Sequence, residues 1–513
     1  MKHLWLARLL SSVGIPLWLS GQVGMSIAVR AQAIPGSAVT SNQVLLANQS
    51  TVAEGICLEQ LGSAIDAIAH QPALARSRWG ILVQTLAATE TDRRILYARE
   101  AQQYFIPASN AKLLTSAAVL RQLGPQFRIR TSIYQLSSLP QATVLSVVGR
   151  GDPSLTNADL QDLAQQLHRQ GIRQIDQLII NDQYFRGATV HPHWEWEDVQ
   201  AGYGAPVNSL ILNQNEMGLT LLPQALGRPL KVVWDRSIDG LQWQIENNSI
   251  TVATSEPEFI EVGRDFSRPI LRVSGQLRMG SQPETVSVAI PNPTQYFTQQ
   301  FRRALSVAGI TVVRTTLATK LMAEAAPELA FVESPPLSEL LIEVNQTSNN
   351  LYAESLLKQL GTRPNPDGSD DATTAGIEAL ETTLATLDVP PDSYALADGS
   401  GLSRHNLVSP EAVVRTLQAM AYVPEANIYR ASLAVAGTNG TLRHRFRQTP
   451  LQGNLKGKTG TLSGTVALSG YLSPLQHPTL VFSIFVNQSE QRVRTIRRAV
   501  DRVVLLLNRL RDC

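Results

Sequence analysis

The sequence has little of several features that would narrow its function at once. Its 513 residues include two cysteines and eight histidines, and 17% of them are charged. Neither a Cys-x-x-Cys pair nor a His-Glu-x-x-His run is present, so no pattern predicts a metal site and we expect no cofactor. The formal net charge of +2 comes without a basic run interleaved with aromatic residues, which excludes nucleic acid as an expected partner.

The amino terminus carries the pattern of an export signal. Lys2 and Arg8 precede an apolar stretch that ends at the small-x-small site Ala31-Gln32-Ala33. We predict a secretory signal peptide over residues 1–33, with a cut after residue 28 and an uncleaved anchor as alternatives. Residues 34–54, rich in Ser, Asn, Gln and Ala, are expected to form a disordered tether. After cleavage no transmembrane span is expected.

The two cysteines both lie in the exported part of the chain. Cys57 stands near the start of the folded part, and Cys513 is the last residue. An oxidising compartment permits one disulfide between them, but two free thiols are equally compatible with the spacing.

Length and periodicity predict two or three domains. Helical spacing over residues 57–68 is followed by a hairpin (79–86 and 94–98) and a strongly apolar helix from residue 111. Between about 129 and 331 short β-like runs predominate, with helices near 158–168 and 296–308, which indicates an insertion. Alternation from about 217 to 289 predicts a separate all-β module inside it.

The last third of the chain returns to helices and strands. Helices are predicted over 337–342 and 351–360, and strands over 465–472 and 479–486. The final helix places one apolar face toward a partner surface, made of Val493, Ile496, Val500, Val503, Leu507 and Leu510. Its opposite face is rich in arginine, so peripheral membrane contact is an alternative. We favour packing of this helix on the sheet.

Three short motifs occur in a fixed order: Ser109-Asn110-Ala111-Lys112, Ser348-Asn349-Asn350 and Lys458-Thr459-Gly460. Ser-x-x-Lys places a base one helical turn from a hydroxyl, which a serine nucleophile needs. The pKa of such a lysine must fall below about 10.4, by desolvation and a nearby positive charge, for which Lys458 is the candidate. The order Ser-x-x-Lys, Ser-x-Asn, Lys-Thr-Gly is typical of penicillin-recognising acyl-transfer enzymes.

Each motif has a purely structural explanation when taken alone. The motif Ser348-Asn349-Asn350 fits an ordinary helix N-cap with Asn and Ser side chains, and the Lys-Thr-Gly strand fits a polar sheet edge. A second Ser-x-x-Lys, Ser355 to Lys358, lies inside a predicted helix. There the Ser355 hydroxyl is expected to bond a carbonyl one turn back, so we interpret this match as chance.

Further motifs carry a family resemblance. They are Gly149-Arg150-Gly151-Asp152-Pro153, Gly204-Ala205-Pro206-Val207-Asn208, Asp398-Gly399-Ser400-Gly401-Leu402-Ser403-Arg404-His405-Asn406 and Gly437-Thr438-Asn439-Gly440-Thr441-Leu442. With the three motifs above, the chain from about residue 55 to its end resembles the D-alanyl-D-alanine carboxypeptidase/endopeptidase family, the low-molecular-mass class C penicillin-binding proteins.

The resemblance implies an α/β (α+β) fold. A transpeptidase-like catalytic domain, with an antiparallel sheet flanked by helices, would comprise residues 55–128 and 332–513. Insert domain II would comprise 129–209 and 291–331, and a nested β-rich insert domain III residues 210–290. In this fold the first and last helices pack side by side, so the resemblance also implies a disulfide between Cys57 and Cys513.

The resemblance also implies an activity and a location. Ser109 would attack the D-Ala-D-Ala bond of a peptidoglycan stem peptide, release D-Ala and pass the acyl group to water. Cleavage of D-Ala-diaminopimelate cross-links would be the related endopeptidase activity, and β-lactams would acylate the same serine. The protein would act in the bacterial periplasm or cell envelope.

The expected roles of the residues follow from the motifs and the resemblance. Lys112 is the general base, Ser348 and Asn350 transfer protons and orient the substrate, and Lys458 anchors a carboxylate. The hydroxyls of Thr459 and Thr461 assist Lys458, Gly460 lets the substrate lie against the strand, and the Thr461 N–H completes an oxyanion hole.

By resemblance, three further residues would recognise the zwitterionic end of a diaminopimelate side chain: Arg404, Asp182 and Phe185. Each also has a structural explanation, as a turn brace, a strand end or a core residue. The chain departs from the family at Asn181-Asp182, often two acids, and at Ser463, often a longer side chain. Both departures concern substrate preference.

Two rival functions remain at this point. A serine β-lactamase or esterase of the same superfamily is disfavoured by the large insertions and by Ser-x-Asn in place of Tyr-x-Asn. A noncatalytic cell-wall-binding protein predicts decayed motifs, and none has decayed. The partial glycine pattern at Gly149-Arg150-Gly151 lacks a Walker lysine and is interpreted as a turn.

Overall fold

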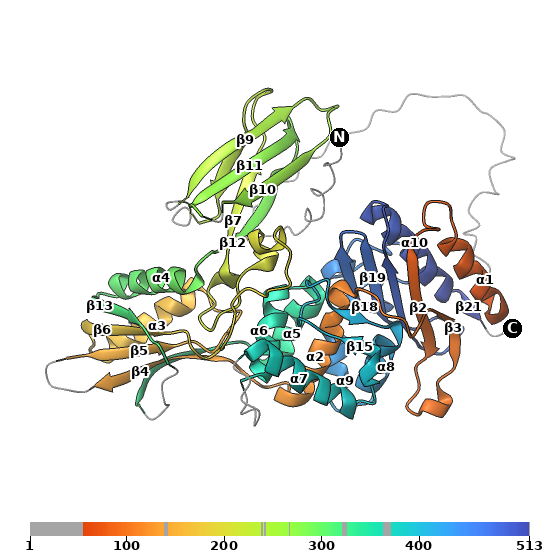
Figure 1. Ribbon diagram of the computed structural model, residues 1–513, viewed down its shortest axis with the longest axis horizontal. Coiled ribbons are helices and arrows are strands. Elements are labelled where there is room, and N and C mark those ends of the chain that lie inside the picture. The colour runs from red at the N-terminus through yellow and green to blue at the C-terminus, as the bar shows by residue number, and fades with distance from the viewer. Residues whose placement is uncertain are drawn as a thin grey trace, which may run out of the picture.

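The computed structural model describes residues 55–137, 142–236, 240, 243–265, 267–320, 326–362, 371–511 and 513. The predicted signal peptide (1–33) and tether (34–54) lie outside these residues. The chain forms a large α/β body, a smaller sheet-and-helix body beside it, and a projecting all-β lobe (Figure 1).

The large body is built on a six-stranded antiparallel sheet of order β17-β18-β19-β20-β2-β3. Its strands are β2 (Arg78–Thr85), β3 (Ile95–Arg99), β17 (Ala434–Val435), β18 (Leu455–Leu462), β19 (Thr465–Leu472) and β20 (Leu480–Asn487). Every residue of β19 and β20 is buried. A strand buried on both sides requires cover on both faces of its sheet, and helices supply it.

One face of the sheet is covered by α1 (Leu58–Ala69) and α10 (Val493–Leu507). The apolar face of α10 is buried against the sheet through Ile496, Val500 and Val503, so the helix packs on the core and does not lie free for a membrane surface. Leu510, expected on the same helix, belongs to the short strand β21 (Leu510–Arg511).

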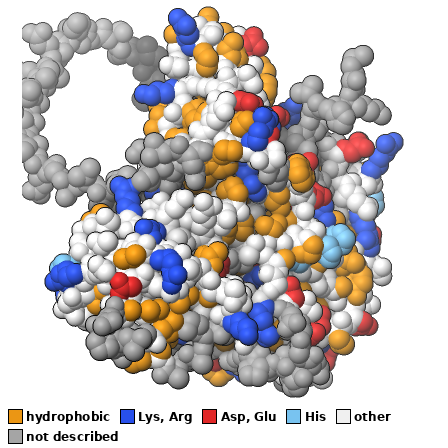
Figure 2. Space-filling view, turned by 60° about the vertical axis from the view of Figure 1, so that its left-hand side comes forward, with side chains coloured by type: hydrophobic (Ala, Val, Ile, Leu, Met, Phe, Trp, Pro, Cys, Tyr) orange, Lys and Arg blue, Asp and Glu red, His pale blue; other side chains and the backbone are white. Residues whose placement is uncertain are grey.

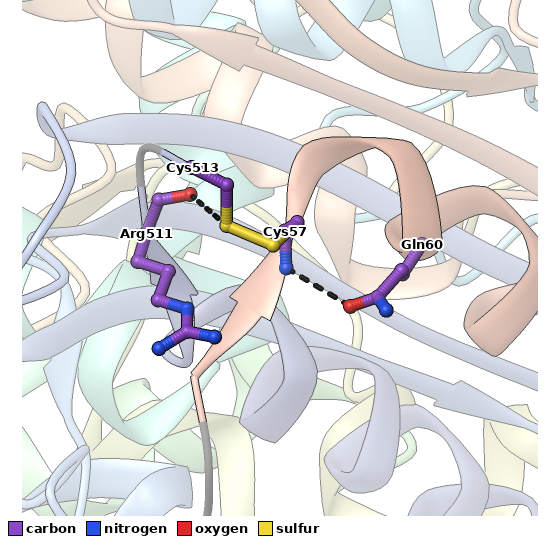
Figure 3. The surroundings of a disulfide bond; sticks show 4 residues. All are labelled: Cys57, Gln60, Arg511 and Cys513. Carbon is purple, nitrogen blue, oxygen red and sulfur yellow. Dashed lines mark hydrogen bonds between the residues drawn. A yellow bond between two sulfur atoms is a disulfide. The ribbon is translucent and has the colours of Figure 1, made fainter.

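The two ends of the described chain meet. Strand β1 (Ile56–Cys57) pairs in parallel with β21, and a disulfide joins Cys57 to Cys513 with their Cα atoms 5.7 Å apart (Figure 3). The backbone N–H of Cys57 also donates to the side chain of Gln60 at 3.3 Å, at the start of α1.

Helices on the other face of the sheet form a second core. They are α2 (Ala111–Leu123), α5 (Leu337–Ile342), α6 (Asn350–Leu360), α7 (Ala372–Thr386), α8 (Pro410–Met420) and α9 (Ala426–Ala431). A π-helical turn (Glu343–Thr347) links α5 to α6, and the short strands β15 (Tyr394–Ala395) and β16 (Leu407–Val408) form a ribbon. Helix α2 is buried over ten consecutive residues, which matches its almost uniformly apolar and small composition.

The smaller body interrupts the large one. Its sheet has the order β13-β6-β5-β4-β14, covered by α3 (Asn157–Arg169) and α4 (Pro293–Val307). The strands are β4 (Arg130–Ser137), β5 (Val144–Val148), β6 (Gln174–Asn181), β13 (Thr311–Leu317) and β14 (Glu328–Glu333). Strands β4 and β14 pair with Arg130 opposite Glu333, so the chain leaves and re-enters the large body at one place. Neighbouring entry and exit points are what an inserted domain requires.

The projecting lobe repeats this arrangement. It has two three-stranded sheets, β12-β7-β8 and β10-β11-β9. They consist of β7 (Glu216–Leu222), β8 (Lys231–Trp234), β9 (Gln244–Val252), β10 (Phe259–Arg264), β11 (Ile270–Arg278) and β12 (Glu284–Ala289). Its first and last strands, β7 and β12, are paired. The exact domain limits at 128, 209, 290 and 331 stay predictions.

Among the described residues no helix is both long and apolar enough to cross a membrane. On the face shown in Figure 2, Lys and Arg side chains are dispersed among acidic and apolar ones and form no continuous basic field.

Candidate active site

Ser109 lies in the 3-10 turn η2 (Ala108–Asn110), which runs directly into α2. Ala108 has a φ of 47°, a left-handed conformation that L-residues other than Gly seldom adopt. The turn is contacted by β18 through Gly460, where an added Cβ would lie 2.8 Å from the carbonyl oxygen of Pro107. The missing side chain of Gly460 lets the strand approach the serine turn, and its expected role in admitting the substrate stays a prediction.

Lys112 is completely buried and has three hydrogen-bond acceptors. Its Nζ lies 3.0 Å from Oγ of Ser109, 2.6 Å from Oδ1 of Asn350 and 2.6 Å from the carbonyl oxygen of Ser400. In the neutral amine, two N–H groups directed at Asn350 and Ser400 leave the lone pair directed at Ser109. The lysine is thus oriented to accept the proton of the Ser109 hydroxyl.

Burial lowers the pKa of Lys112 to about 7, and the carboxylates of Asp398 and Glu354 oppose this shift. Burial also lowers the pKa of Lys458 well below its usual range, and the charge of Lys112 adds to that effect. Desolvation is therefore the main cause for both lysines. The charge of Lys112 lowers the pKa of Lys458, whereas the expected effect of Lys458 on the pKa of Lys112 is not among the causes of its shift.

The Ser-x-Asn motif lies between the π-helical turn and α6. Ser348 has a φ of 66°, which directs its side chain to Lys458, whose Nζ donates to Ser348 Oγ at 2.7 Å. Asn349 is the N-cap of α6 and accepts the N–H of Tyr352 at 3.1 Å. The capping explanation is therefore correct for Asn349, while its two neighbours contact the two lysines.

Strand β18 presents an open edge beside Lys458. The carbonyl oxygen of Leu455 accepts the backbone N–H of Ala436, the residue that follows β17. Backbone groups of alternate residues in a strand point to the same side, so those of Gly457, Thr459 and Thr461 also face the side of β17. Because β17 pairs only as far as Gly457, the N–H of Thr461 lies on the uncovered part of the edge. The hydroxyl of Thr461 accepts from Arg497 at 3.1 Å, and the Thr459 hydroxyl bonds Thr441 at 2.8 Å.

Arg404 connects the end of β18 to the insertion. Its guanidinium donates to the carbonyl of Ser463 at 3.2 Å and pairs with Glu195 at 2.6 Å. Both partners are on the surface, with Arg404 27% and Glu195 46% exposed. The structure thus brings Arg404 and Ser463 together next to the Lys-Thr-Gly strand.

Asp182 and Phe185 have structural contacts instead. The carboxylate of Asp182 accepts from the backbone N–H groups of Ser209 and Leu210 and from the side chains of Asn208 and Thr294. These contacts hold the 208–210 loop of the insertion and tie it to the start of α4. The ring of Phe185 is 7% exposed and packs on Gly151. Both residues thus have the structural contacts that the structural alternatives expected, and their part in substrate recognition stays a prediction.

An acidic residue and an aromatic residue that the sequence reasoning missed, Asp198 and Tyr203, lie near Arg404 and Asn350. Tyr203, in the 3-10 turn η4 (Gly202–Gly204), accepts the Nδ2 N–H of Asn350 on its carbonyl oxygen at 2.9 Å. Its hydroxyl donates to Asp198 at 3.0 Å, and the charge of Arg404 acts on Asp198. The signal was present, because Tyr203 directly precedes the quoted Gly204-Ala205-Pro206 motif.

The second Ser-x-x-Lys pair is not assembled as a catalytic one. The buried Ser355 hydroxyl donates to the carbonyl of Gly151 in the insertion, and Lys358 donates to the carbonyl of Ala188 at 2.8 Å. The expected bond of Ser355 to its own helix was wrong, because the insertion packs close enough to supply an acceptor. Within the described part of the chain, no three His, Cys, Asp or Glu residues are grouped to hold a metal ion.

An antiparallel sheet covered by helices, with these three motifs gathered at strand β18, defines the penicillin-binding-protein class of serine peptidases. Comparison with known proteins then gives the family. Residues 61–506 match the D-Ala-D-Ala carboxypeptidase 3 (S13) family. The D-alanyl-D-alanine carboxypeptidase of Actinomadura sp. is 33% identical over 453 residues, which cover 85% of this chain and 82% of that protein.

Two further comparisons agree. Penicillin-sensitive carboxypeptidase A of Dictyostelium discoideum is 28% identical over 468 residues, 84% of this chain and 87% of its own length. The crystal structure of penicillin binding protein 4 (dacB) from Haemophilus influenzae superposes with a TM-score of 0.73 at 23% identity, covering 86% of this chain and 99% of that one. The chain belongs to the D-Ala-D-Ala carboxypeptidase 3 (S13) family and is a serine-type carboxypeptidase. The predicted family and fold class are confirmed.

Proposed function

We propose that the chain hydrolyses the D-Ala-D-Ala end of peptidoglycan stem peptides through an acyl-enzyme on Ser109. The observation that carries this proposal is the buried amine of Lys112, 3.0 Å from the Ser109 hydroxyl and fixed by two further acceptors. With a pKa of about 7, this amine is largely neutral in mildly alkaline solution and available as a base.

The proposed reaction has two halves. Lys112 takes the proton of Ser109 as its oxygen attacks the carbonyl carbon of the D-Ala-D-Ala bond, and the N–H groups of Ser109 and Thr461 hold the oxyanion. The proton then passes by way of Ser348 to the leaving amine, so the C–N bond breaks and D-Ala departs. Water, deprotonated by the same lysine, attacks the ester, and the lysine passes this proton to the Ser109 oxygen as the ester bond breaks and the shortened peptide leaves.

Binding of the peptide end is assigned to strand β18. Lys458, with the Thr459 and Thr461 hydroxyls nearby, would bind the terminal carboxylate of the substrate. β-Lactams carry a carboxylate and a strained amide in similar positions, so we expect them to acylate Ser109. The name of the Dictyostelium relative, penicillin-sensitive carboxypeptidase A, supports this expectation.

A second substrate class is favoured by the surroundings of Arg404. Arg404 supplies a positive charge, and Glu195 and Asp198 supply negative charges, beside the end of β18. A zwitterionic group such as the end of a diaminopimelate side chain is complementary to this arrangement. We therefore propose Asp198 in the role first given to Asp182, and D-Ala-diaminopimelate cross-links as endopeptidase substrates.

The cellular setting is proposed on the same basis. The predicted signal peptide and the disulfide between Cys57 and Cys513 agree with an exported enzyme of the bacterial periplasm, where peptidoglycan is accessible and disulfides persist.

Labelling with a fluorescent penicillin tests the nucleophile. Wild type is expected to be labelled once, and Ser109→Ala not at all. Ser355→Ala is the matched control, since it removes the serine of the other Ser-x-x-Lys pair and should keep the label. Undiminished labelling of Ser109→Ala would falsify the assignment, and rapid turnover of penicillin would favour the β-lactamase alternative. Release of D-alanine from a stem pentapeptide must be lost in parallel with the label.

A further inference from the structure

We propose that Glu354 is a positioning residue for the general base: it holds the Ser400 peptide against Lys112 and supplies a buried negative charge that keeps this lysine basic. The inference rests on the proposed role of Lys112. It concerns a residue outside the three motifs, one that does not touch the reacting atoms.

Helix α6 acts on the lysine at two successive turns, directly through Asn350 and through the Ser400 peptide from Glu354. Asn350, at its first residue, accepts directly from Lys112 Nζ at 2.6 Å. Glu354 is four residues later and therefore on the same face of the helix. Its Oε1 accepts the N–H of Ser400 at 2.7 Å, and the carbonyl of Ser400 accepts from Lys112 at 2.6 Å. One helix face thus fixes both acceptors that direct the lysine lone pair to Ser109.

The segment containing Ser400 is held from the other side by α2. Thr115 donates to the carbonyl of Gly399 at 2.7 Å, and an added Cβ at Gly399 would lie 3.0 Å from the side chain of Leu357. The segment is therefore clamped between two helices. A shift of the Glu354 carboxylate would be transmitted to the Ser400 carbonyl, because little free space surrounds it.

Glu354 differs from the other buried acid of this region. Asp398 accepts from the N–H groups of Gly401 and Ser403 and from the side chains of Asn406 and Trp194, so it shapes the loop besides raising the pKa of Lys112 through its charge. Glu354 is 2% exposed, and its carboxylate accepts from the backbone N–H groups of Gly399 and Ser400, the residue whose carbonyl touches the base. In a poorly solvated interior its charge acts on Lys112 with little screening.

Charged groups face Glu354 from every neighbouring element. Lys112 lies on α2, Asp398 on the clamped loop and Lys358 one turn further along α6. Residues from the insertion and from the start of α7, His191 and Asp371, line the same cavity of about 190 Å³ as Glu354 and Lys358. Burial, together with Asp398, raises the pKa of Glu354 to about 7.

The direction of the electrostatic effect is fixed. A carboxylate near an amine favours the ammonium form, so Glu354 raises the pKa of Lys112 and partly offsets the effect of burial. Without this charge Lys112 would lose its proton at lower pH and would be a weaker base toward Ser109.

The test is the pH dependence of acylation by a fluorescent penicillin in the full-length protein. Glu354→Gln keeps an acceptor oxygen for the Ser400 N–H and removes the charge. We expect the acidic limb of the rate profile to move to lower pH by up to about one unit, since Glu354 is itself only partly ionised near pH 7, and the plateau to fall several-fold. Thr115→Val is the matched control: it loosens the same segment without a charge change, so its limb should stay in place.

An unmoved acidic limb in Glu354→Gln, with any fall in rate equal at all pH values, would overturn the proposal and leave Glu354 a purely structural residue. If that variant does not accumulate as folded protein, Glu354→Asp decides. It keeps the charge but is too short to reach Ser400, so an unchanged rate would refute the positioning role and a lowered plateau with an unmoved limb would support it. Loss of labelling in Ser109→Ala separates failure of this inference from failure of the proposed function.

Discussion

Replacing Asn350 by Asp tests the base with one atom changed. The new carboxylate would lie where Oδ1 now accepts from Lys112 Nζ at 2.6 Å, and an opposite charge at this distance raises the pKa of a lysine by about one to three units. A rise of about two units from the pKa of about 7 would lower the neutral fraction of Lys112 at pH 7 from about half to about 1%. Acylation at pH 7 should therefore fall about 50-fold and recover above pH 9.

The assay is the second-order rate of labelling by a fluorescent penicillin between pH 5 and pH 10. Asn349→Asp is the matched control, because it adds the same charge one residue away at an N-cap that accepts the N–H of Tyr352, a position where Asp is also favoured. Its acidic limb should move far less. If Asn350→Asp labels at Ser109 with an unshifted limb, Lys112 is not the group whose deprotonation controls acylation.

Three other predictions follow from the same geometry. The pKa of Lys112 is about 7 in the folded protein and has its ordinary value in the unfolded chain, so keeping a lysine at this position costs stability at pH 7. Lys112→Met should therefore have a higher free energy of unfolding than wild type at pH 7. In urea unfolding this difference should shrink by about 1.4 kcal/mol per pH unit up to about pH 10. Gly460→Ala should reduce labelling at least ten-fold and lower Tm, since its Cβ would lie 2.8 Å from the Pro107 oxygen; a normal rate would show that β18 can move away. Reduction of the Cys57–Cys513 bridge, or its double replacement by Ser, should lower the free energy of unfolding by about 2–5 kcal/mol without changing the acylation rate of folded protein, measured by urea unfolding with and without reductant.

The sequence predicted those parts of the fold in which one segment carries its own signal. Helix α10 could be predicted because its apolar residues recur on one face of the helix, and that face is buried as expected. Strands β19 and β20 could be predicted because each is a short apolar run. The pairing of the first and last strands of each insertion could not be predicted from the sequence. Strands β4 and β14, for example, pair residues about 200 positions apart, and no local pattern encodes that register.

The site divides in the same way. The three motifs were identified because each is contiguous and their order is specific. The roles expected for Asp182 and Phe185 stay predictions, whereas Asp198 and Tyr203, which lie beside Arg404 and Asn350, were missed. Both pairs lie in the insertion at similar local spacing. Only the packing of η4 against α6 decides which pair reaches Asn350, and that packing has no counterpart in either segment alone.

Comparison of the two Ser-x-x-Lys pairs shows what turns this spacing into a catalytic arrangement. Both lysines are buried, and burial lowers the pKa of both. Ser355, inside α6, is fully buried and its hydroxyl donates a hydrogen bond to the carbonyl of Gly151. It is therefore not accessible to a substrate, and its O–H is not directed to Lys358. Ser109 stands one turn before its helix, is partly exposed, and has the amine of Lys112 directed to it.

The difference therefore lies in the turn that precedes α2. Its left-handed Ala108 and the side-chain-free approaches of Gly460 and Gly401 bring strand β18 and the loop of Ser400 against one serine from two sides. Ser400 supplies an acceptor for the base, and β18 supplies the open edge for the substrate. The spacing of a serine and a lysine three residues apart is only the local part of this site. The serine becomes reactive because the turn before α2, strand β18 and the loop of Ser400 meet at residues 107–110.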